Sequence, residues 1–528
     1  MAKYANLIAA VEAAIKTNGT QAITGQVLQN QLKNMISKLG SAYQFGGLVQ
    51  PTDAFSFDAD AKIAFLACTQ GRYPAFGNFS LRSGEVALFI YEGTWKKEII
   101  SYYANTQIYG IRHFFNNASP DLTRIGDADL HRDLPVQSLM RRCVVDDTGA
   151  VRYYLNADDS TKKEDGTAAN LTGADGQVMV EIPAHYRKAS LNTAGGYMDI
   201  EISIYPFEGA IRVPRYLVSA YEATLDREDN KLASVVNTSA KYRGGNNNAD
   251  WDGTYRSLLG LPATNISLTN FRTYGRNRGT GWGCYDYNAH LAIYWLFAIE
   301  YATLNSQKAF NPDLDSAGYH QGGLGPGVTK FSNWNNYNSN NPIIPCGFTN
   351  SLGNKTGVKT FTLTPEQAAA YGSEHSESVP SYRGIENPFG HIWKWTDGFL
   401  GIGTGEYQEI YVCRDASKYA SVLTSDYVHF STHQAAANGY CKAIVASDPN
   451  LQAEIRVFGD IFDRDDSGSD STYFCDYHYH SNTEGTVYGL QVGGGANIGS
   501  FAGLAFFNAY DGPALADAAL GSRLTWSE

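Results

Sequence analysis

The chain has 528 residues, enough for two to four domains, and it carries 41 Lys and Arg against 53 Asp and Glu, a formal net charge of -12 at pH 7. This acidic balance excludes a nucleic-acid partner, because proteins that bind a phosphate backbone present a basic surface. The 53 Gly, 35 Tyr and 25 Phe against 5 Met favour an all-β or irregular architecture over a helical bundle.

The N-terminus gives no sign of secretion or membrane insertion. One basic residue precedes a short amphipathic run, no cleavage signature follows, and no run of 18 apolar residues comes after it. We therefore expect synthesis in a host cytoplasm without membrane insertion. The cysteines are odd in number, widely spaced and without a CxxC pair, so most are expected to be buried thiols: Cys68, Cys143, Cys284, Cys346, Cys413, Cys441 and Cys475.

Residues 1–45 are predicted to be a helical attachment or oligomerisation segment. Apolar residues in 5–17 follow helical spacing, and Asn18-Gly19 gives a plausible stop. A second helix is predicted over 24–40, where the seam of a short coiled coil is formed by Leu28, Leu32, Met35 and Leu39. The pattern leaves open whether this helix packs on its own domain or forms a stalk.

Residues 46–103 change character and predict a small β module. Three strand-like runs, KIAFLA, EVALFIY and WKKEII, are separated by turn-forming residues. Residues 104–528 then form a long mixed region. It begins with strands and a polar loop at 158–177, continues with the strand-like runs VMVEIP and MDIEISIYP, and contains a buried helix predicted over 291–307.

Motifs for catalysis or metal binding are weak. There is no GxSxG, GxxxxGKS, HExxH or strand-linked GxGxxG, so we expect no enzyme activity, no catalytic residues and no cofactor. In CDYHYH (475–480), strand alternation puts Asp476, His478 and His480 on one face, a possible metal set, although a polar strand is favoured. DRDDSGSD (463–470) begins like a calcium loop but has Phe474 in the twelfth place, so no metal is expected.

The most distinctive stretch is YRGIENPFGHIWKWTDG (382–398). Its two tryptophans, Trp393 and Trp395, are predicted to be core anchors because each aromatic can bury ~150 to 250 Å². The stretch resembles the signature strand of the C-type-lectin-like fold in its formylglycine-generating-enzyme variety, with His391 and Lys394 as departures. The resemblance implies an α+β fold, with a C-terminal C-type-lectin-like domain over 104–528.

Two further resemblances point to phage proteins. The closing GSRL (521–524) resembles the terminal strand of variable proteins diversified by retroelements, the family of the phage major tropism determinant. Residues 272–307 and 319–329 are similar to segments of the same fold, and the N-terminal third resembles the attachment region of tail-fibre proteins. In such a family, erroneous copying scatters residues over a loop surface while Gly, Ala and Ser keep the scaffold.

This implication fits an irregular stretch, GANIGSFAGLAFFNAYDG (495–512), whose bulky residues follow neither helix nor strand period. Residues 465–520 also contain no Lys, Arg, Met or Trp, where proportional sampling would give about five or six. The resemblance thus implies a variable ligand-binding region at about 465–524, with scaffold residues Gly493, Gly494, Gly499, Gly503 and Asn508. Its expected contact residues are Tyr473, Asp476, Tyr477, His478, Tyr479, His480, Tyr488, Leu490, Ile498, Phe501, Phe506, Tyr510, Asp511, Leu515 and Asp517.

The expected function is that of a tail-fibre adhesin in the virion, which binds a bacterial surface protein or glycan non-covalently. The N-terminus would join other tail or baseplate proteins, and its heptad seam fits a homotrimer or a dimer. Two alternatives stay open at this stage. An oxidase of the formylglycine-generating kind needs a cysteine pair that the C-terminus lacks, and a calcium-dependent lectin is supported only by the Trp395-Thr396-Asp397 segment.

Overall fold

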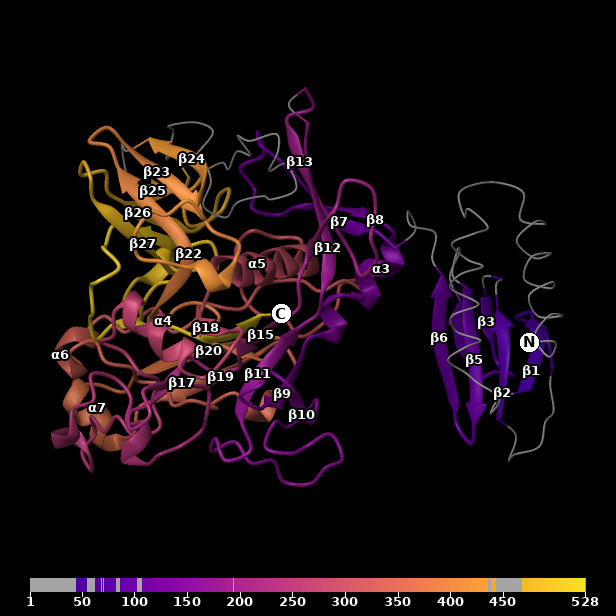
Figure 1. Cartoon of the computed structure of the whole chain (residues 1–528), viewed down its shortest axis with the longest axis horizontal. Helices are drawn as coiled ribbons and strands as arrows, with labels where there is room; N and C mark the ends of the chain where they lie inside the picture. Colours follow the sequence, from indigo (N-terminus) through magenta and orange to yellow (C-terminus); the bar gives the residue numbers. More distant parts are fainter. Residues whose placement is uncertain are drawn as a thin grey trace. The chain divides into compact units, whose positions relative to one another are not determined.

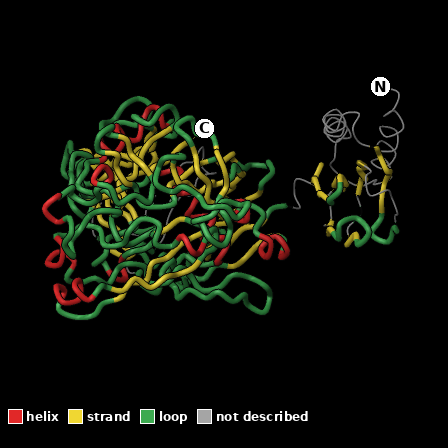
Figure 2. Tube along the Cα trace, turned by 90° about the horizontal axis from the view of Figure 1, so that it is seen from below, coloured by secondary structure: helices red, strands yellow, loops and turns green. Residues whose placement is uncertain are grey.

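The computed structural model describes residues 44–54, 62–67, 69, 71–81, 86–101, 107–192, 194–434, 438–442 and 468–527. The chain divides into two compact units, Met1–Ile108 and Tyr109–Glu528. The described part is mostly β with few, short helices between many loops (Figure 2). The helices predicted at 5–17 and 24–40, the coiled-coil seam, Cys68 and most of the DRDDSGSD stretch lie outside the described residues.

Unit 1 contains a four-stranded sheet and a small hairpin. The sheet has the order β1 (Gln44–Val49), β2 (Lys62–Ala67), β5 (Val86–Glu92), β6 (Trp95–Ser101), and the hairpin is formed by β3 (Gly71–Tyr73) and β4 (Phe79–Leu81). β1 and β2 are parallel, whereas β5 runs antiparallel to β2 and β6. Phe65, Phe76 and Phe89 form its aromatic core. The three strands predicted in this region are confirmed.

Unit 2 is built from three larger sheets, two of them antiparallel and the largest mixed, and from two smaller ones. A five-stranded sheet has the order β14 (Ile211–Val213), β12 (His185–Asn192), β13 (Tyr197–Ser203), β7 (Tyr109–Phe114), β8 (Thr123–Gly126). A six-stranded sheet has the order β10 (Val151–Tyr154), β9 (Arg141–Val145), β11 (Gln177–Ile182), β15 (Tyr216–Ser219), β30 (Leu524–Ser527), β18 (Trp282–Cys284). The smaller sheets are β16 (Thr224–Asp226) with β17 (Lys231–Ala233), and β19 (Gly357–Thr362) with β20 (Ser376–Tyr382) and β21 (Ile385–Glu386).

The largest sheet carries the C-terminal region. Its order is β24 (Val428–Gln434), β23 (Tyr407–Val412), β22 (Trp393–Gly403), β27 (Val487–Val492), β28 (Phe507–Ala509), β26 (Tyr477–His480), β25 (Gly439–Tyr440), and β29 (Leu520–Gly521) pairs with β22. β26 and β28 are parallel, as are β22 and β29. The sheet therefore joins strands from before and after residue 465 into one framework (Figure 1).

The helices of unit 2 are α3 (Ala128–Asp133), α4 (Leu268–Arg276), α5 (Tyr287–Tyr301), α6 (Trp334–Asn338) and α7 (Pro365–Tyr371). α5 is buried on all sides except at Asn288, and it contacts β22 and β7. A helix that is apolar all round needs such enclosure. It begins where the carboxylate of Asp286 accepts a hydrogen bond from the Ala289 N–H, and it ends at Ala302, whose φ is 49°.

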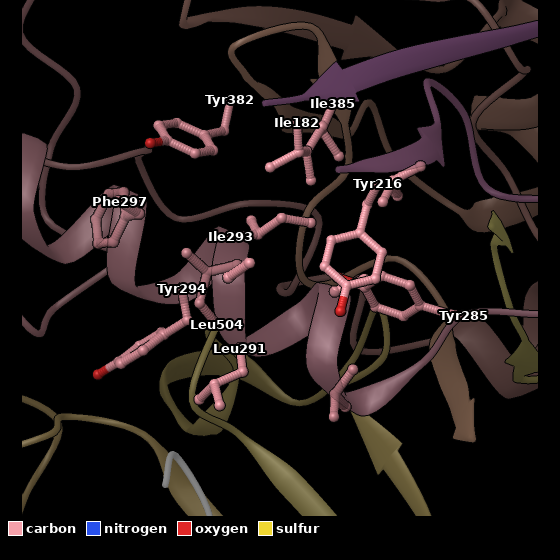
Figure 3. Close-up of a cluster of buried hydrophobic side chains, with 14 of the residues drawn as sticks. Ile182, Tyr216, Tyr285, Leu291, Ile293, Tyr294, Phe297, Tyr382, Ile385 and Leu504 are labelled. Atoms are coloured by element: carbon pink, nitrogen blue, oxygen red, sulfur yellow. The ribbon is translucent and has the colours of Figure 1, made fainter. Parts of the chain in front are cut away.

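The main hydrophobic core surrounds α5. Leu291, Tyr294 and Phe297 project from the helix among side chains of the six-stranded sheet and of the C-terminal region, including Ile182, Tyr216 and Leu504 (Figure 3). The helix predicted over 291–307 is thus confirmed, but its bounds are corrected, because the cap at Asp286 starts it earlier and the left-handed Ala302 stops it. Residues 303–307 leave the helix and run beside the glycine-rich stretch.

β22 carries the two tryptophans that were predicted as core anchors. Trp395 is fully buried and Trp393 is 9% exposed, which confirms the prediction. The two departures from the family pattern are also buried. The Lys394 ammonium lies 2.9 Å from the carboxylate of Glu222, and His391 contacts the other oxygen of that carboxylate through Nδ1. These two residues and Glu222 therefore form a buried charge network at the start of β22, in which loss of one partner would leave an unpaired buried charge.

Three further predictions concern strands β11 and β13, the GSRL stretch and the cysteines. The strands predicted from VMVEIP and MDIEISIYP correspond to β11 and β13. The polar stretch 158–177 has only isolated bridges, apart from Gln177, which begins β11. The GSRL stretch ends β29 and starts β30, and Arg523 between them is buried, donating to the carbonyls of Asn387 and Ser219. The cysteines within the described residues are buried and free, as predicted.

Candidate functional site

Four aromatic side chains gather on the edge of the largest sheet, and we call them the aromatic patch: Tyr440, Tyr477, Tyr479 and Phe501. Tyr477 and Phe501 stack with ring centroids 4.2 Å apart and planes 11° from parallel. Tyr440 meets both rings edge-on, at 5.3 Å from Tyr477 and 5.4 Å from Phe501. All four are half-buried, so each ring keeps part of its surface in contact with solvent.

The alternation of β26 explains how the patch forms. Successive side chains of a strand point to opposite faces, so Tyr477 and Tyr479 face outward while His478 and His480 face inward. Beneath the patch lies Phe506, which is fully buried and contacts Tyr479 at 5.9 Å and Trp393 at 4.6 Å. The patch therefore rests directly on the core anchors of β22.

The glycine-rich stretch 495–512 owes its backbone path to side chains outside it. The Gln307 amide donates to the carbonyls of Gly499 and Ala502, at 3.0 and 2.6 Å. The Leu504 N–H donates to the Ser306 hydroxyl at 3.0 Å, and the Leu504 carbonyl accepts from His290 Nε2 at 2.8 Å. Because these bonds fix the backbone, the bulky side chains of the stretch need no helix or strand period.

Asp476, the residue before β26, completes this support from the buried side of that strand. Its carboxylate accepts a hydrogen bond from the Ala505 N–H at 2.7 Å, and burial raises the pKa of Asp476 well above its usual value. A Cβ on Gly503 would lie 2.0 Å from the same carboxylate, and one on Gly494 would lie 2.9 Å from the Phe506 ring. These contacts explain why glycine stands at two of the predicted scaffold positions.

The third kind of support is a polar network at the predicted scaffold residue Asn508. Its side-chain Nδ2 donates to Gln491 and to Asp511, both at 3.0 Å. Its side-chain Oδ1 accepts from the Tyr510 N–H at 2.9 Å. Gln491 also donates to Asp511 at 3.1 Å. The network holds the turn that follows β28, so Asp511 acts in the structure as an internal acceptor.

The fifteen predicted contact residues separate into three groups by exposure. Three are exposed: Tyr510, Leu515 and Asp517. Six are half-buried: Tyr473, Tyr477, Tyr479, Ile498, Phe501 and Asp511. Six are buried: Asp476, His478, His480, Tyr488, Leu490 and Phe506. A buried side chain cannot contact a partner at the surface, so the structure corrects the prediction for these last six.

Each buried residue has an internal role that explains the correction. His478 stacks on His480 and on Phe507, and burial lowers the pKa of His480 to about 4. Tyr488 donates to the Ser481 hydroxyl at 3.1 Å, while Leu490 packs in the main core. Although Asp476, His478 and His480 share one face as expected, no group of three metal-ligating side chains occurs among the described residues.

The exposed members lie apart from the ring contacts of the patch. Leu515 and Asp517 belong to the loop between β28 and β29, and the Asp517 carbonyl accepts from the Asn265 N–H at 2.8 Å. Half-buried Tyr473 also lies apart from the patch, with its ring centroid 5.7 Å from the Nζ of Lys442. The structure thus brings Tyr477, Tyr479 and Phe501 together, and gives no ring contact between them and Tyr473 or Tyr510.

Sequence reasoning missed Tyr440. It lies before residue 465, in β25, and reaches the patch only because β25 pairs with β26, with Tyr440 opposite Tyr477. Its hydroxyl is 3.0 Å from that of Ser500, which links it to the glycine-rich stretch. A search limited to the C-terminal composition could not find it, since the signal is a strand pairing across more than thirty residues.

Comparisons with known proteins add little beyond this geometry. No family model matches the chain, and no curated protein matches it. Among solved structures, the chain is similar to three variants of Major Tropism Determinant, each at 11% identity. The U1 variant has a TM-score of 0.25, covering 90% of this chain and 86% of that chain. The M1 variant has 0.24, covering 92% and 98%, and the P3c variant has 0.23, covering 90% and 85%.

TM-scores in this range do not establish a common fold. What the chain's own residues define is a β-rich protein with a half-exposed aromatic patch on a backbone that framework side chains hold in place. Within the described ranges, no helix is long and apolar enough to cross a membrane.

Proposed function

We propose that the chain is the receptor-binding protein of a phage tail fibre, and that the aromatic patch contacts a protein or glycan on the bacterial surface. One observation carries the proposal: Tyr440, Tyr477, Tyr479 and Phe501 form a half-exposed cluster on a backbone fixed by other residues. Tyrosine and phenylalanine give a wide, rigid contact area at low cost in conformational entropy, as in antibody loops. Clustered aromatic anchors also dominate the energetics of many interfaces.

The same proposal assigns finer features to the chain. In this proposal, unit 2 has a C-type-lectin-like arrangement, with its variable region at about 465–524. Residues 1–45 join three copies of the chain to one another, and join the trimer to other tail or baseplate proteins in the virion. Trimerisation would supply avidity to patches that bind weakly one at a time.

An oxidase role has less support. Nucleophilic or redox chemistry requires an accessible thiolate, and burial raises the pKa of Cys475, as it does that of Cys346. Both thiols are buried. We therefore propose a protein without enzyme activity.

The calcium-lectin alternative is also weakened by a specific contact. The Asp397 carboxylate, which would be the calcium ligand of that segment, is bound bidentately by Arg272 at 2.6 and 2.8 Å. An arginine fork occupies the carboxylate oxygens that a cation would need. Receptor binding that persists in the presence of a chelator would agree with this interpretation.

The test uses purified protein and a panel of bacterial strains. In the variant Tyr477→Ser/Phe501→Ser, both stacked rings are lost, and we expect binding to the recognised strain to fall about tenfold or more. The matched control is Phe114→Ser/Tyr197→Ser, which removes another partly exposed aromatic pair, 5.6 Å apart, on the five-stranded sheet. Equal binding by the first variant and the wild type would overturn the proposal.

A further inference from the structure

A groove of about 530 Å³ lies in unit 2, lined by residues from four segments. One side is the beginning of α4, and another is the loop between β28 and β29, which contributes Ala514 and Ala516. Leu225 from β16 and Ile266 form a small apolar floor, and both are buried. A concave site with a limited apolar floor and several converging polar groups is the usual form of a small-ligand site.

The polar lining is dominated by five asparagines: Asn230, Asn246, Asn247, Asn265 and Asn270. All five are exposed. The side-chain amides of Asn230, Asn265 and Asn270 make no hydrogen bond with any described residue. An amide presents two donors and one acceptor, so each of these can bind a group that both donates and accepts.

Backbone conformation accounts for only some of these asparagines. Asn230, Asn247 and Asn265 have φ of 51°, 62° and 59°, a region that asparagine tolerates better than most residues. Asn246 has a local reason of another kind, because its side-chain oxygen accepts a hydrogen bond from the Asn248 N–H at 3.2 Å. Asn270 has neither reason, and asparagine is a poor helix former at such an exposed position.

An aromatic ring and one positive charge complete the lining. Tyr274 follows Asn270 by one helical turn on α4, so both side chains lie on the same face of the helix. Arg227 donates through Nε to the Arg243 carbonyl at 2.7 Å, and it has no ion pair with any described carboxylate. Burial lowers the pKa of Arg227 to about 10, because the guanidinium charge is partly removed from water and no counter-ion compensates for it.

No carboxylate lines the groove, although the chain as a whole is acidic. The groove thus combines three kinds of group. Its amides can hydrogen-bond hydroxyl groups, the ring of Tyr274 can pack on the apolar face of a sugar, and the guanidinium of Arg227 can bind an anion. Phosphate-rich ligands fit less well, because Arg227 is the single basic residue of the lining.

We propose that this groove binds a saccharide that carries a carboxylate group, such as a uronic-acid unit, with Asn265 and Asn270 on its hydroxyl groups and Arg227 on its carboxylate. The site is separate from the aromatic patch, and the inference does not depend on the proposed function.

The test is an array of uronate-containing and neutral oligosaccharides of matched length, probed with the full-length protein and followed by saturation-transfer NMR on the sugars that bind. Uronate-containing sugars are expected to bind, and neutral ones more weakly. Asn265→Gly/Asn270→Ala is expected to raise the Kd at least about tenfold, because it removes both side-chain amides, both of them exposed, while glycine tolerates the positive φ at position 265. Arg227→Gln is expected to remove the preference for acidic sugars.

Two controls separate this site from the rest of the molecule. Asn116→Ala/Asn336→Ala removes two exposed asparagines outside the groove and should leave saccharide binding unchanged. Tyr477→Ser/Phe501→Ser should also leave it unchanged, even if it abolishes binding to cells. The inference is overturned if no uronate-containing sugar binds, or if the groove variants bind as well as the control variants.

Discussion

At the scale of single residues, buried polar side chains determine the shape of the glycine-rich stretch. Asp476 and His290 each bind a backbone group of that stretch, the Ala505 N–H and the Leu504 carbonyl. Burial raises the pKa of Asp476 and lowers that of His290, so it favours the uncharged form of both side chains. Their protonation therefore links the stability of the stretch to pH.

Replacing Asp476 tests this link for an acid. Because the pKa of Asp476 is raised in the folded protein, the folded state holds the proton more tightly, and stability falls as pH rises above the usual value of 3.8. Asp476→Asn keeps an acceptor for the Ala505 N–H but does not titrate. The free energy of unfolding of this variant should therefore rise relative to that of the wild type as pH rises. Asp476→Ala should lose about 1 to 3 kcal/mol, since the Ala505 N–H is left unpaired. Urea unfolding at several pH values measures both, and an unchanged pH slope in Asp476→Asn would contradict the interpretation.

His290 gives the opposite dependence. Its Nε2–H donates to the Leu504 carbonyl at 2.8 Å, and its Nδ1 lies 3.0 Å from the Tyr285 hydroxyl. Burial lowers the pKa of His290 to about 4, so the unfolded chain takes up the proton first, and stability is lost as pH falls from about 6.5 to 4. This amounts to about 3 kcal/mol from one buried histidine. In His290→Gln, the decline in the free energy of unfolding over that range should be smaller, and an equal decline would refute the assignment.

At the scale of elements, the stretch 495–512 is partly buried, and its backbone is set by its neighbours. Ser306, Gln307 and His290 come from α5 or the residues that follow it, and Asp476 precedes β26. Side chains that point outward from such a backbone can change without removing these bonds. This separation of framework from surface is what the proposed variable binding region requires.

Gly503 tests the separation most simply. Gly503→Ala would place a methyl group 2.0 Å from the Asp476 carboxylate, and we expect a loss of about 1 to 3 kcal/mol in the free energy of unfolding. Gly283 in β18 is the matched control, because a Cβ there meets no atom within 4 Å and its φ is not positive. Thermal and urea unfolding of both variants would measure the difference. Equal stability of the two variants would show that Asp476 does not confine the stretch.

Periodicity predicted some of these elements well and others poorly. The alternation in CDYHYH placed Tyr477 and Tyr479 on one face, and strand-like runs located β2, β11 and β13, because both signals are local. The burial of Tyr488 and Leu490 could not be predicted in the same way. They lie in β27, which pairs with β22 and places Leu490 in the main core, and these contacts are made by residues far away in the sequence. Tyr440 was missed for the same reason.

At the scale of the whole molecule, the chain consists of two compact units with separate hydrophobic cores. Unit 2 contains the aromatic patch, the groove and all the framework contacts described for them. Because each unit has its own core, we expect unit 2 to fold without unit 1.

A fragment covering 109–528 tests this expectation. It should show the near-UV circular dichroism of its many buried aromatic residues and unfold in one cooperative transition. Its melting temperature should lie within a few degrees of the corresponding transition in the full chain. A shift of that size corresponds to a change of about 1 kcal/mol in the free energy of unfolding. A fragment that is soluble but gives no cooperative transition would contradict the division into independent units.

The central claim is that the patch residues serve recognition while the framework serves stability. The most direct measurement is a library in which Tyr477, Tyr479 and Phe501 are varied together, with each member scored for binding across a panel of bacterial strains and for melting temperature. We predict that most members keep a melting temperature within a few degrees of the wild type, while the set of bound strains changes from member to member. A library whose members bind the same strains as the wild type, or mostly fail to fold, would contradict the claim.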